Sequence, residues 1–586
     1  MDVLVLLVRR QGQLVSRAEI ADQLWGKDVF VDVETGVNTA ISKIRQALRD
    51  SAETPTFVET VPGRGYRFVA QVEPVESSSP APPEQAASPT PAPRGSGSMR
   101  RTAIAIAVVA TLAGGLLWRY ARQPAPARVS IAVLPFVNLG NNPEHQYLAD
   151  GFTDETAASL AQIDPERLSV KGRTLRYKGT TKSVAEIGRE LVVDYLVDSS
   201  MLVEGSRVRV TARLIRVSDE EHVWSQSYER EPTSMISFQQ ELSTTIAEQV
   251  RLRLPADRVT GFGRRQTRNA EAYDAYLRGR HLLGPRTPQS TARAIPLFER
   301  AIALDPQYAL AWSALSLTYG ASAINGDARP QDVWPPARKA ALEAVRANPA
   351  LSESQLAVGY TDWLLAWDWT RAEAELREAV RLDPSNTDAL RVLGHALSQM
   401  GRHAEAEAAM RRGRELDPLD ALHHALSAQV AFQAREFSTA LGHARQAVLL
   451  DSTLWIGYVM LAQAHEQLGE NDLALAALAD ATRLSQRNSK AIAMRGYVLG
   501  KMGRTAEAEE VLKLLETASQ QRYVPATSFA MVHASLGHTD EVFRWLDKAF
   551  EARDVHLMFL PVDAKWDAYR KDPRFAALLA RCGFAR

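Results

Sequence analysis

Residues 382–416 read LDPSNTDALRVLGHALSQMGRHAEAEAAMRRGREL, and this layout returns along the second half of the chain. The leucines that open successive units differ in number by 34, namely Leu382, Leu416, Leu450 and Leu484. A second grid with the same spacing consists of Gly401, Arg435, Gly469, Gly503 and Gly537. Such a constant period indicates stacked copies of one helical unit that bury a continuous core only together.

A period of 34 residues is that of tetratricopeptide repeats, in which each unit is a helical pair. Large residues such as Trp312 and Tyr319 occur with small ones such as Ala294 and Ala301 at helical spacing, which indicates a solenoid core rather than a cofactor pocket. The sequence predicts about eight repeats over residues 270–586, a C-terminal cap near residues 566–584, and a protein or peptide partner in the groove of the repeats.

One interval is longer than the period. Between Leu304 and Ala347 the stretch SAINGDARPQDVWPP (322–336) is interpreted as an insertion that lengthens one turn between helices. Trp334 within it is either an exposed anchor or a tryptophan packed in a loop. The adjacent His423 and His424 are interpreted as a pair on a helix surface.

Composition excludes several classes of protein. The formal net charge of the 586 residues is zero, so any affinity for nucleic acid must be local. The single cysteine, Cys582, excludes an intramolecular disulfide framework and a cysteine-based metal site. Glycine-rich phosphate loops, a Ser-His-Asp motif and an HExxH helix are absent from the sequence, so we expect no cofactor, no metal and no enzymatic activity.

Residues 15–70 have the order helix, loop, helix, hairpin. Ser16 is placed to cap a helix that runs to Trp25, a second helix spans Val37 to Arg49, and FVETVPGRGYRFVA (57–70) reads as two strands around a tight turn. One face of the second helix is apolar and contains Val37, Ile41, Ile44 and Leu48. The other face carries side chains suited to base edges and phosphates: Asn38, Thr39, Ser42, Lys43, Arg45 and Gln46.

VSRAEIADQLWG, VNTAISKIRQALRD and ETVPGRGYRFVA resemble the winged helix-turn-helix of OmpR/PhoB-type regulators, especially membrane-anchored regulators of the CadC and ToxR kind. The resemblance implies that residues 37–49 form the recognition helix, and that loop 26–34 matches the segment that can touch RNA polymerase. It further implies a wing that contacts double-stranded DNA through Arg64, Gly65, Tyr66 and Arg67. The family pattern begins with a small sheet that precedes the first helix, whereas MDVLVLLVRR starts inside that helix, so we interpret Met1 as a start codon assigned too late; the alternative is a broken domain.

The charge of this region is only weakly positive. From Val37 to Arg67 there are five basic residues, Lys43, Arg45, Arg49, Arg64 and Arg67, against three acidic ones, Asp50, Glu53 and Glu59. A monomer with this surplus of two should bind DNA weakly. We therefore expect a homodimer in the active state, with two copies side by side on promoter half-sites.

TAIAIAVVATLAGGLLW (102–118) carries no charge and follows a Pro/Ser/Ala-rich linker, residues 73–99. As a helix this run would be about 26 Å long, close to the roughly 30 Å of a bilayer core. We interpret residues 100–121 as a transmembrane helix, with a buried helix as the alternative. Arginines flank the run on both sides, so flanking charge decides no orientation.

Residues 128–255 alternate strand-like and helix-like segments, which predicts an α/β domain with a mixed sheet. IAVLPF, YLADGFTDE, EIGRELVVDYLVDSSM and VTARLIRVSDEEHVWSQSY resemble the TolB N-terminal-like domain of bacterial regulators. Asp150, Asp154 and Glu155 are interpreted as charges in the first turns of a helix rather than as an acidic site.

The sequence thus predicts a multidomain fold: a winged helix (α+β, residues 1–72), one transmembrane helix, an α/β mixed-sheet domain and an all-α tetratricopeptide solenoid. The expected function is a membrane-anchored one-component transcriptional regulator of the bacterial inner membrane, with its N-terminus cytoplasmic and its C-terminus periplasmic, that senses an envelope signal or partner through its repeats. The alternative is a membrane-tethered repeat scaffold with a non-functional winged helix.

Overall fold

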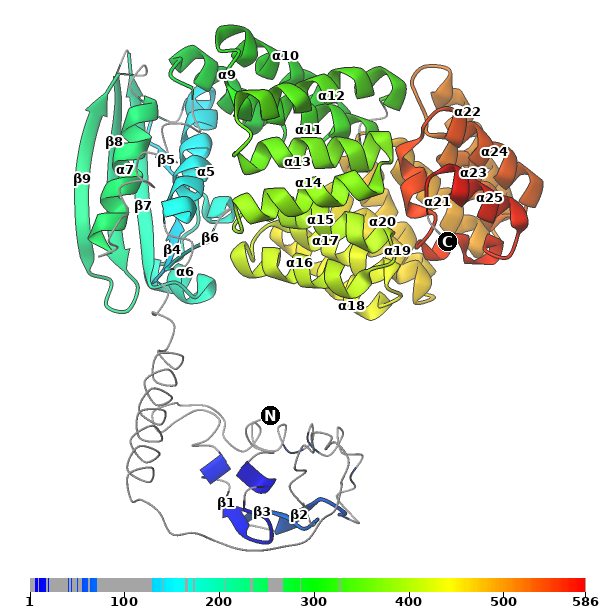
Figure 1. The fold of residues 1–586 in the computed structure, drawn as a ribbon, viewed down its shortest axis with the longest axis horizontal. Coiled ribbons are helices and arrows are strands. Elements are labelled where there is room, and N and C mark those ends of the chain that lie inside the picture. Colours follow the sequence, from blue (N-terminus) through cyan, green and yellow to red (C-terminus); the bar gives the residue numbers. More distant parts are fainter. Residues whose placement is uncertain are drawn as a thin grey trace, which may run out of the picture. The chain divides into compact units, whose positions relative to one another are not determined.

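The computed structural model describes residues 129–584 apart from 141, 164–166, 172–173, 206, 232–234, 251–266, 285 and 326–327. In the N-terminal part it describes residues 6–8, 10–16, 19–20, 41, 44, 50, 55–61 and 64–70. The chain forms two compact units, Met1–Gly114 and Gly115–Arg586 (Figure 1). Each is considered by itself.

The N-terminal unit contains a three-stranded antiparallel sheet in the order β1-β3-β2. Strands β2 (Val58–Val61) and β3 (Gly65–Phe68) form a hairpin, and β1 (Leu14–Ser16) pairs with the other edge of β3. Behind the sheet lies a small core made of Leu7, Val15, Ile20, Ile41, Val58, Tyr66 and Phe68. The hairpin is the one predicted from FVETVPGRGYRFVA.

An α/β domain opens the second unit. Its sheet has the order β6-β4-β7-β8-β9, with β5 beside β7; β4 is parallel to β6 and β7, and β7, β8 and β9 are antiparallel. The elements are β4 (Val129–Val133), β5 (Val137–Asn138), α5 (Gln146–Ile163), β6 (Leu168–Lys171), α6 (Val184–Leu191), β7 (Tyr195–Glu204), β8 (Arg207–Arg216), β9 (His222–Arg230) and α7 (Met235–Gln249). This is the predicted mixed sheet, to which the structure adds α7.

The two faces of this sheet have separate cores. Ile131 and Val133 of β4 face α5 and α7, where Phe152 and Phe238 stack with ring centroids 6.1 Å apart. Ala132, between them on β4, belongs to a second core under α6. Successive side chains of β4 therefore pack against helices on opposite faces of the sheet.

Beyond residue 270 every regular element in the described residues is helical. The helices α9 to α24 form eight antiparallel pairs, in agreement with the predicted repeats (Figure 1). Their bounds are α9 (Ala270–Leu282), α10 (Pro288–Leu304), α11 (Ala309–Asn325), α12 (Pro330–Ala347), α13 (Ser352–Thr361), α14 (Trp369–Leu382), α15 (Thr387–Gln399), α16 (His403–Leu416), α17 (Ala421–Gln433), α18 (Phe437–Leu450), α19 (Trp455–Gln467), α20 (Asn471–Leu484), α21 (Ser489–Lys501), α22 (Thr505–Ser519), α23 (Ala526–Ser535) and α24 (Thr539–Glu551).

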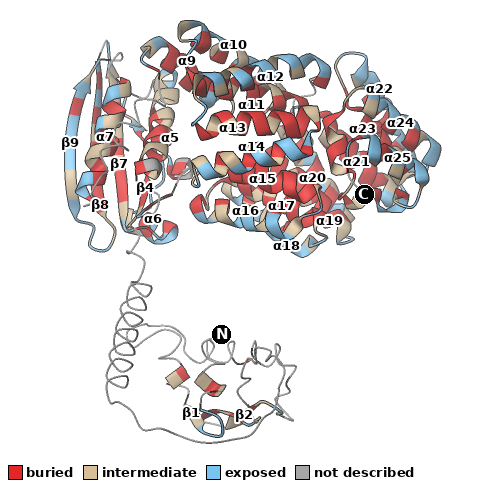
Figure 2. Cartoon of the chain, in the orientation of Figure 1, coloured by how far each residue is buried: buried red, intermediate tan, exposed pale blue. Residues whose placement is uncertain are grey.

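First helices lie on the inside of the array and second helices on the outside. Successive first helices pack against one another: α13 on α15, α15 on α17, α17 on α19 and α19 on α21. Figure 2 shows α15 and α17 coloured mostly as buried, whereas exposed residues gather on α16 and α18. Small side chains allow these close approaches; a Cβ on Gly394 would lie 2.7 Å from the sulfur of Met410.

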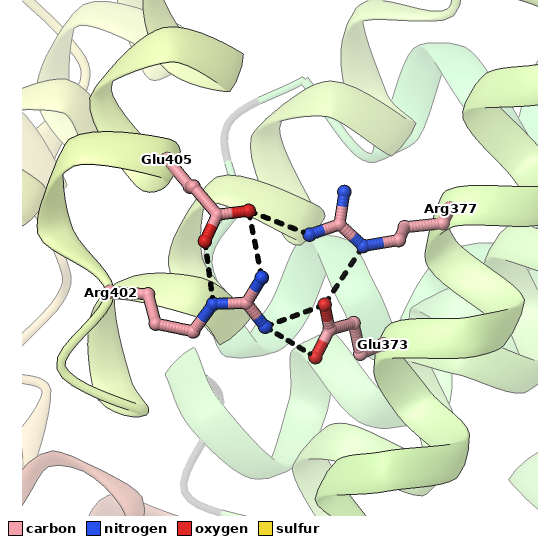
Figure 3. A network of polar contacts seen from close by, with 4 residues as sticks. All are labelled: Glu373, Arg377, Arg402 and Glu405. Atoms are coloured by element: carbon pink, nitrogen blue, oxygen red, sulfur yellow. Dashed lines mark hydrogen bonds and ion pairs between the residues drawn. The ribbon is translucent and has the colours of Figure 1, made fainter. Parts of the chain in front are cut away.

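On the outside, a network of four charged side chains links the third and fourth pairs (Figure 3). Arg402 donates to both oxygens of Glu373 at 2.6 and 2.7 Å and to both oxygens of Glu405 at 2.7 Å. Arg377 donates to the same two carboxylates at 2.8 and 2.9 Å. These hydrogen bonds hold the pKa of Glu373 and Glu405 below the ordinary value.

The predicted fold class and localisation require a correction. Among the helices of the described residues, none is long and apolar enough to cross a membrane. The two longest, α5 and α12, are amphipathic elements of the folded unit and carry charges such as Asp154 and Arg338. The run Thr102–Trp118, on which the transmembrane helix and the single-pass inner-membrane topology depended, lies outside the described residues.

The predicted insertion is also corrected. SAINGDARPQDVWPP falls on the end of α11 and the start of α12, which are 17 and 18 residues long, whereas α15 and α16 have 13 and 14. The additional residues therefore lengthen two helices and not the turn between them. Trp334 is half-buried in α12, where the guanidinium of Arg553 lies 4.9 Å from the centre of its ring.

Candidate nucleic-acid interface

The helix that follows Ser16 begins with a reciprocal cap. The Ser16 hydroxyl accepts a hydrogen bond from the backbone N–H of Glu19 at 3.2 Å, and the Glu19 carboxylate accepts from the Ser16 N–H at 2.9 Å. These bonds from Ser16, with Arg10 at 2.6 Å, lower the pKa of Glu19 to about 2. The predicted cap at Ser16 is confirmed, and its partner is Glu19, as in a capping box.

The second helix is described at two core positions. Ile41 is 2% exposed, and Ile44 packs against the same core. Both lie on the face that was predicted to be apolar. The predicted base-reading residues on the opposite face, Asn38, Thr39, Ser42, Lys43, Arg45 and Gln46, lie outside the described residues and stay predictions.

Asp50, just beyond this helix, fixes the hairpin. Its carboxylate accepts hydrogen bonds from three consecutive backbone N–H groups: Thr56 at 2.7 Å, Phe57 at 3.2 Å and Val58 at 2.7 Å. Asp50 thereby fixes the start of β2. From the sequence Asp50 was identified only as an acidic residue. Its role was not predicted, because hydrogen bonds to backbone groups six to eight residues away produce no pattern of side chains.

The four predicted wing contacts divide into two kinds. Arg64 lies in the turn between β2 and β3 and is exposed; its N–H donates to the Val61 carbonyl at 3.0 Å. Arg67 on β3 is half-exposed and lies 3.4 Å from Glu59, so an acidic neighbour already offsets part of its charge.

Gly65 and Tyr66 have structural roles instead. Tyr66 is 3% exposed and belongs to the core behind the sheet. A Cβ on Gly65 would lie 2.1 Å from the Val15 carbonyl oxygen, so only glycine lets β1 and β3 approach. The wing sequence identified these positions correctly as part of the hairpin, but their side chains or backbone face the fold.

The acidic residues of α5 bind the first repeat. Arg280 of α9 lies 3.3 Å from Asp154 and 3.0 Å from Glu155, and Asp150 lies 3.3 Å from His281 of the same helix. The helix begins at Gln146, so these carboxylates are not in its first turn, and the predicted interaction with the helix dipole is wrong. They form a joint between the α/β domain and the repeats.

The α/β domain contacts the repeats a second time. Lys171 of β6 donates to the Glu415 carbonyl of α16 at 2.7 Å, and Leu419 packs on the core under α6. On the first contact surface Tyr273 of α9 donates to Gln239 of α7 at 2.9 Å. The domain is therefore held at two places along the array and cannot pivot freely on it.

Comparison with known proteins agrees with this division of the chain. A family model described as the C-terminal domain of transcriptional regulatory proteins matches residues 1–68, and one for the second domain of HilA/YgeH-like transcriptional regulators matches residues 127–246. Tetratricopeptide-repeat models match residues 364–430 and 457–488. The chain therefore carries a winged-helix domain of the transcriptional-regulator type, a HilA-like second domain and tetratricopeptide repeats.

Three relatives illustrate the range of similar proteins. The chain is 23% identical over 420 residues to the transcriptional regulator HilA of Salmonella typhimurium, which is 71% of this chain and 65% of the relative. It is 39% identical over 74 residues to the cholera toxin transcriptional activator of Vibrio cholerae, 13% of this chain and 25% of the relative. It is 31% identical over 256 residues to a putative adenylate cyclase 3 of Rhizobium meliloti, 43% of each protein. The matched region thus spans less than two thirds of each of these relatives.

Proposed function

We propose that this protein is a one-component transcriptional regulator that binds promoter DNA through its winged helix and receives its input through the α/β domain and the repeats. The observation that carries the proposal is the hairpin geometry. Arg64 is exposed in the turn of a wing whose first strand is fixed at its start by Asp50. The transcriptional-regulator model matched to residues 1–68 and the regulator HilA among the relatives support it.

In this proposal the second helix enters the major groove with Lys43, Arg45 and its polar neighbours, while Arg64 contacts an adjacent phosphate or the minor groove. Each phosphate contact releases counterions, so binding should weaken steeply with salt. Because one domain offers few cations, two copies bind neighbouring half-sites as a homodimer. Loop 26–34, by its resemblance to OmpR/PhoB-type regulators, would contact RNA polymerase in that arrangement.

The input is proposed to be a protein partner. Tetratricopeptide arrays present long surfaces to peptides or helices, and this chain has eight helical pairs for that purpose. The α/β domain is proposed to resemble the TolB N-terminal-like domain and to act as a rigid spacer, since it is held to the array at two places. We further propose that the chain has no catalytic activity, although a putative adenylate cyclase is among its relatives.

The test uses the full chain and genomic DNA fragments. DNA fragments enriched by the purified protein should be bound by it in a gel shift. Lys43→Ala and Arg64→Ala should each weaken this binding by about tenfold, because each removes one phosphate or base contact. Arg189→Ala, on the exposed side of α6, is the control and should leave affinity unchanged.

Two outcomes would reject the proposal. Unchanged affinity in both variants would contradict DNA reading by the wing and second helix. A failure to enrich any DNA would favour the alternative, a repeat scaffold with a non-functional winged helix.

Formation of a cyclic nucleotide from ATP and Mg²⁺ by the same preparation would contradict the proposed absence of catalysis.

A further inference from the structure

The concave side of the repeats already holds a piece of this chain. After α24 the residues 553–570, called here the C-terminal segment, form two short 3₁₀ turns, η6 (Val555–Phe559) and η7 (Ala564–Tyr569), before α25 (Pro573–Arg581). The C-terminal segment contacts the third, fifth, sixth, seventh and eighth helical pairs, through Leu365, Arg435, Gln463, Lys490 and Ala534. A terminal cap that covered only the last repeat would contact the eighth pair and not the third, fifth, sixth or seventh.

Polar contacts hold the middle of the C-terminal segment. The Arg435 guanidinium, from the turn between α17 and α18, donates to the Val562 carbonyl at 2.5 Å and to Asp567 at 2.7 Å. Lys565 lies 2.8 Å from Asp563 and donates to Gln463 of α19 at 3.3 Å. The side chains of Lys565 and Asp563 are only 7% and 8% exposed, so this ion pair is enclosed between the segment and the inner helices.

Arg435 takes the place of a glycine in the turns of the array. Gly401, Gly469, Gly503 and Gly537 occupy the equivalent positions with φ between 73° and 79°, and Arg435 has φ 67°. A residue with a Cβ is strained in this left-handed conformation, so glycine is the favoured choice there. In the described repeats two turns at this spacing depart from glycine, those of Trp367 (φ 60°) and Arg435, and both side chains contact the C-terminal segment.

The start of the C-terminal segment is held in a similar way. Arg553 also has a positive φ, 52°, and donates to the carbonyls of Leu365 and Ala366 at 3.2 and 3.0 Å. Its guanidinium lies over the rings of Trp334 and Trp367, 4.9 and 4.6 Å from their centres. Two arginines in strained backbone conformations thus anchor the segment at separate points.

The inner face beneath the C-terminal segment is polar. Gln463 donates to Gln429, its counterpart one repeat earlier, at 2.8 Å, and both are nearly buried at 4% and 6% exposed. Glutamine is ordinarily exposed, so this buried pair leaves hydrogen-bonding groups on the inner helices that the C-terminal segment meets, as Lys565 does at Gln463. Here the apolar residues of the segment cover this face, with Trp566 in one core and Ala564 against another.

We propose that the C-terminal segment is a built-in occupant of the concave face, and that a partner peptide of the same chemistry reaches this face only when the segment is displaced. That chemistry is an acidic and a basic residue two positions apart among apolar side chains, as in Val562-Asp563-Ala564-Lys565-Trp566. The inference rests on the proposed function and deepens it, because it names the kind of peptide that the repeats bind and the segment that blocks its access. Its tests use no DNA, so their failure is separate from a failure of DNA binding.

The test compares two arginine variants of the full chain. Arg435→Gly restores the preferred residue of the turn and removes both contacts to the segment. Arg487→Gly is the matched control, since Arg487 also has a positive φ, 66°, in a turn between two helices, and its side chain does not meet the segment in any contact of the described residues. Both should fold, but only Arg435→Gly should speed hydrogen exchange of the amides of residues 555–570, by tenfold or more.

Peptide binding then tests occupancy. A fluorescent peptide of residues 554–571 should bind the Arg435→Gly protein at least tenfold more tightly than wild type or Arg487→Gly. Asp567→Ala removes the carboxylate that accepts from Arg435, so it should increase hydrogen exchange and peptide binding as Arg435→Gly does. Unchanged exchange in both Arg435→Gly and Asp567→Ala, or faster exchange without peptide binding, would overturn the proposal.

Discussion

At the scale of single residues, the inner helices bury histidines that the sequence placed on the surface. His423 is fully buried and its Nε2 lies 2.9 Å from the Met410 carbonyl, and His424 lies 3.0 Å from the Pro418 carbonyl. Gly413 makes room for the first ring, because a Cβ there would lie 2.0 Å from it. Two adjacent histidines at consecutive helix positions cannot reveal this burial, since it depends on which neighbour is a glycine.

These histidines predict a loss of stability in acid. Burial lowers the pKa of His395 and of His423 to about 4, from an ordinary value near 6.5. The unfolded chain then binds more protons than the folded one between these values, so the free energy of unfolding is full above pH 6.5 and falls as pH drops toward 4. Each histidine should contribute up to roughly 3 kcal/mol of this loss.

Urea unfolding followed by tryptophan fluorescence at several pH values measures the slope. His423→Gln keeps a donor for the Met410 carbonyl but does not titrate, so its stability should fall less over the same interval. An identical slope in wild type and in this variant would show that His423 is not the group that takes up the proton.

At the scale of elements, the repeat period fixed the turns but not their partners. The 34-residue grid predicted where helices end, and all five grid positions, Arg435 included, have positive φ. The period said nothing of the hydrogen bond from Arg435 to Asp567, 132 residues away, because a long-range contact adds no local pattern. The capping residue Ser16 was predictable because its partner is only three residues away. The role of Asp50 and the burial of Tyr66 depend on more distant contacts and were not predicted.

The four-charge network between α14 and α16 should stabilise the array modestly (Figure 3). Arg402 is 38% exposed and Glu405 50%, so solvent and salt screen their attraction. Arg402→Ala removes contacts to two carboxylates on different helices and should lower the free energy of unfolding by about 1 kcal/mol. The loss should shrink in 1 M salt.

Arg381→Ala is the control, because Arg381 pairs only with Glu378 of the same helix and is 68% exposed. Its effect on urea unfolding should be smaller than that of Arg402→Ala, because solvent screens this exposed pair. An equal effect of both variants would mean that the link between repeats adds nothing to pairing along one helix.

At the scale of the whole folded unit, one core crosses the joint between the α/β domain and the first repeat. Phe152 and Phe238 of the α/β domain belong to the same buried cluster as Tyr276 and Phe298 of the first repeat. Beside that cluster Arg280 faces Glu155, whose side chain is 5% exposed. Burying a carboxylate is tolerable only with a cation and hydrogen bonds close to it, so this pair matters more than those on the surface.

The Arg280 side chain is itself 39% exposed, so water screens part of this attraction, and Arg280→Ala should lower the free energy of unfolding by roughly 2 kcal/mol. The control Arg300→Ala removes an exposed partner of Glu271 at 3.8 Å and should change it by less than about 0.5 kcal/mol. Because the core is shared, the α/β domain and the first repeats should lose structure in a single calorimetric transition in wild type, and Arg280→Ala should lower the temperature of that transition. A separate transition for the α/β domain in wild type would contradict a shared core, and the input from the repeats would then have to pass through a flexible joint rather than through a rigid one.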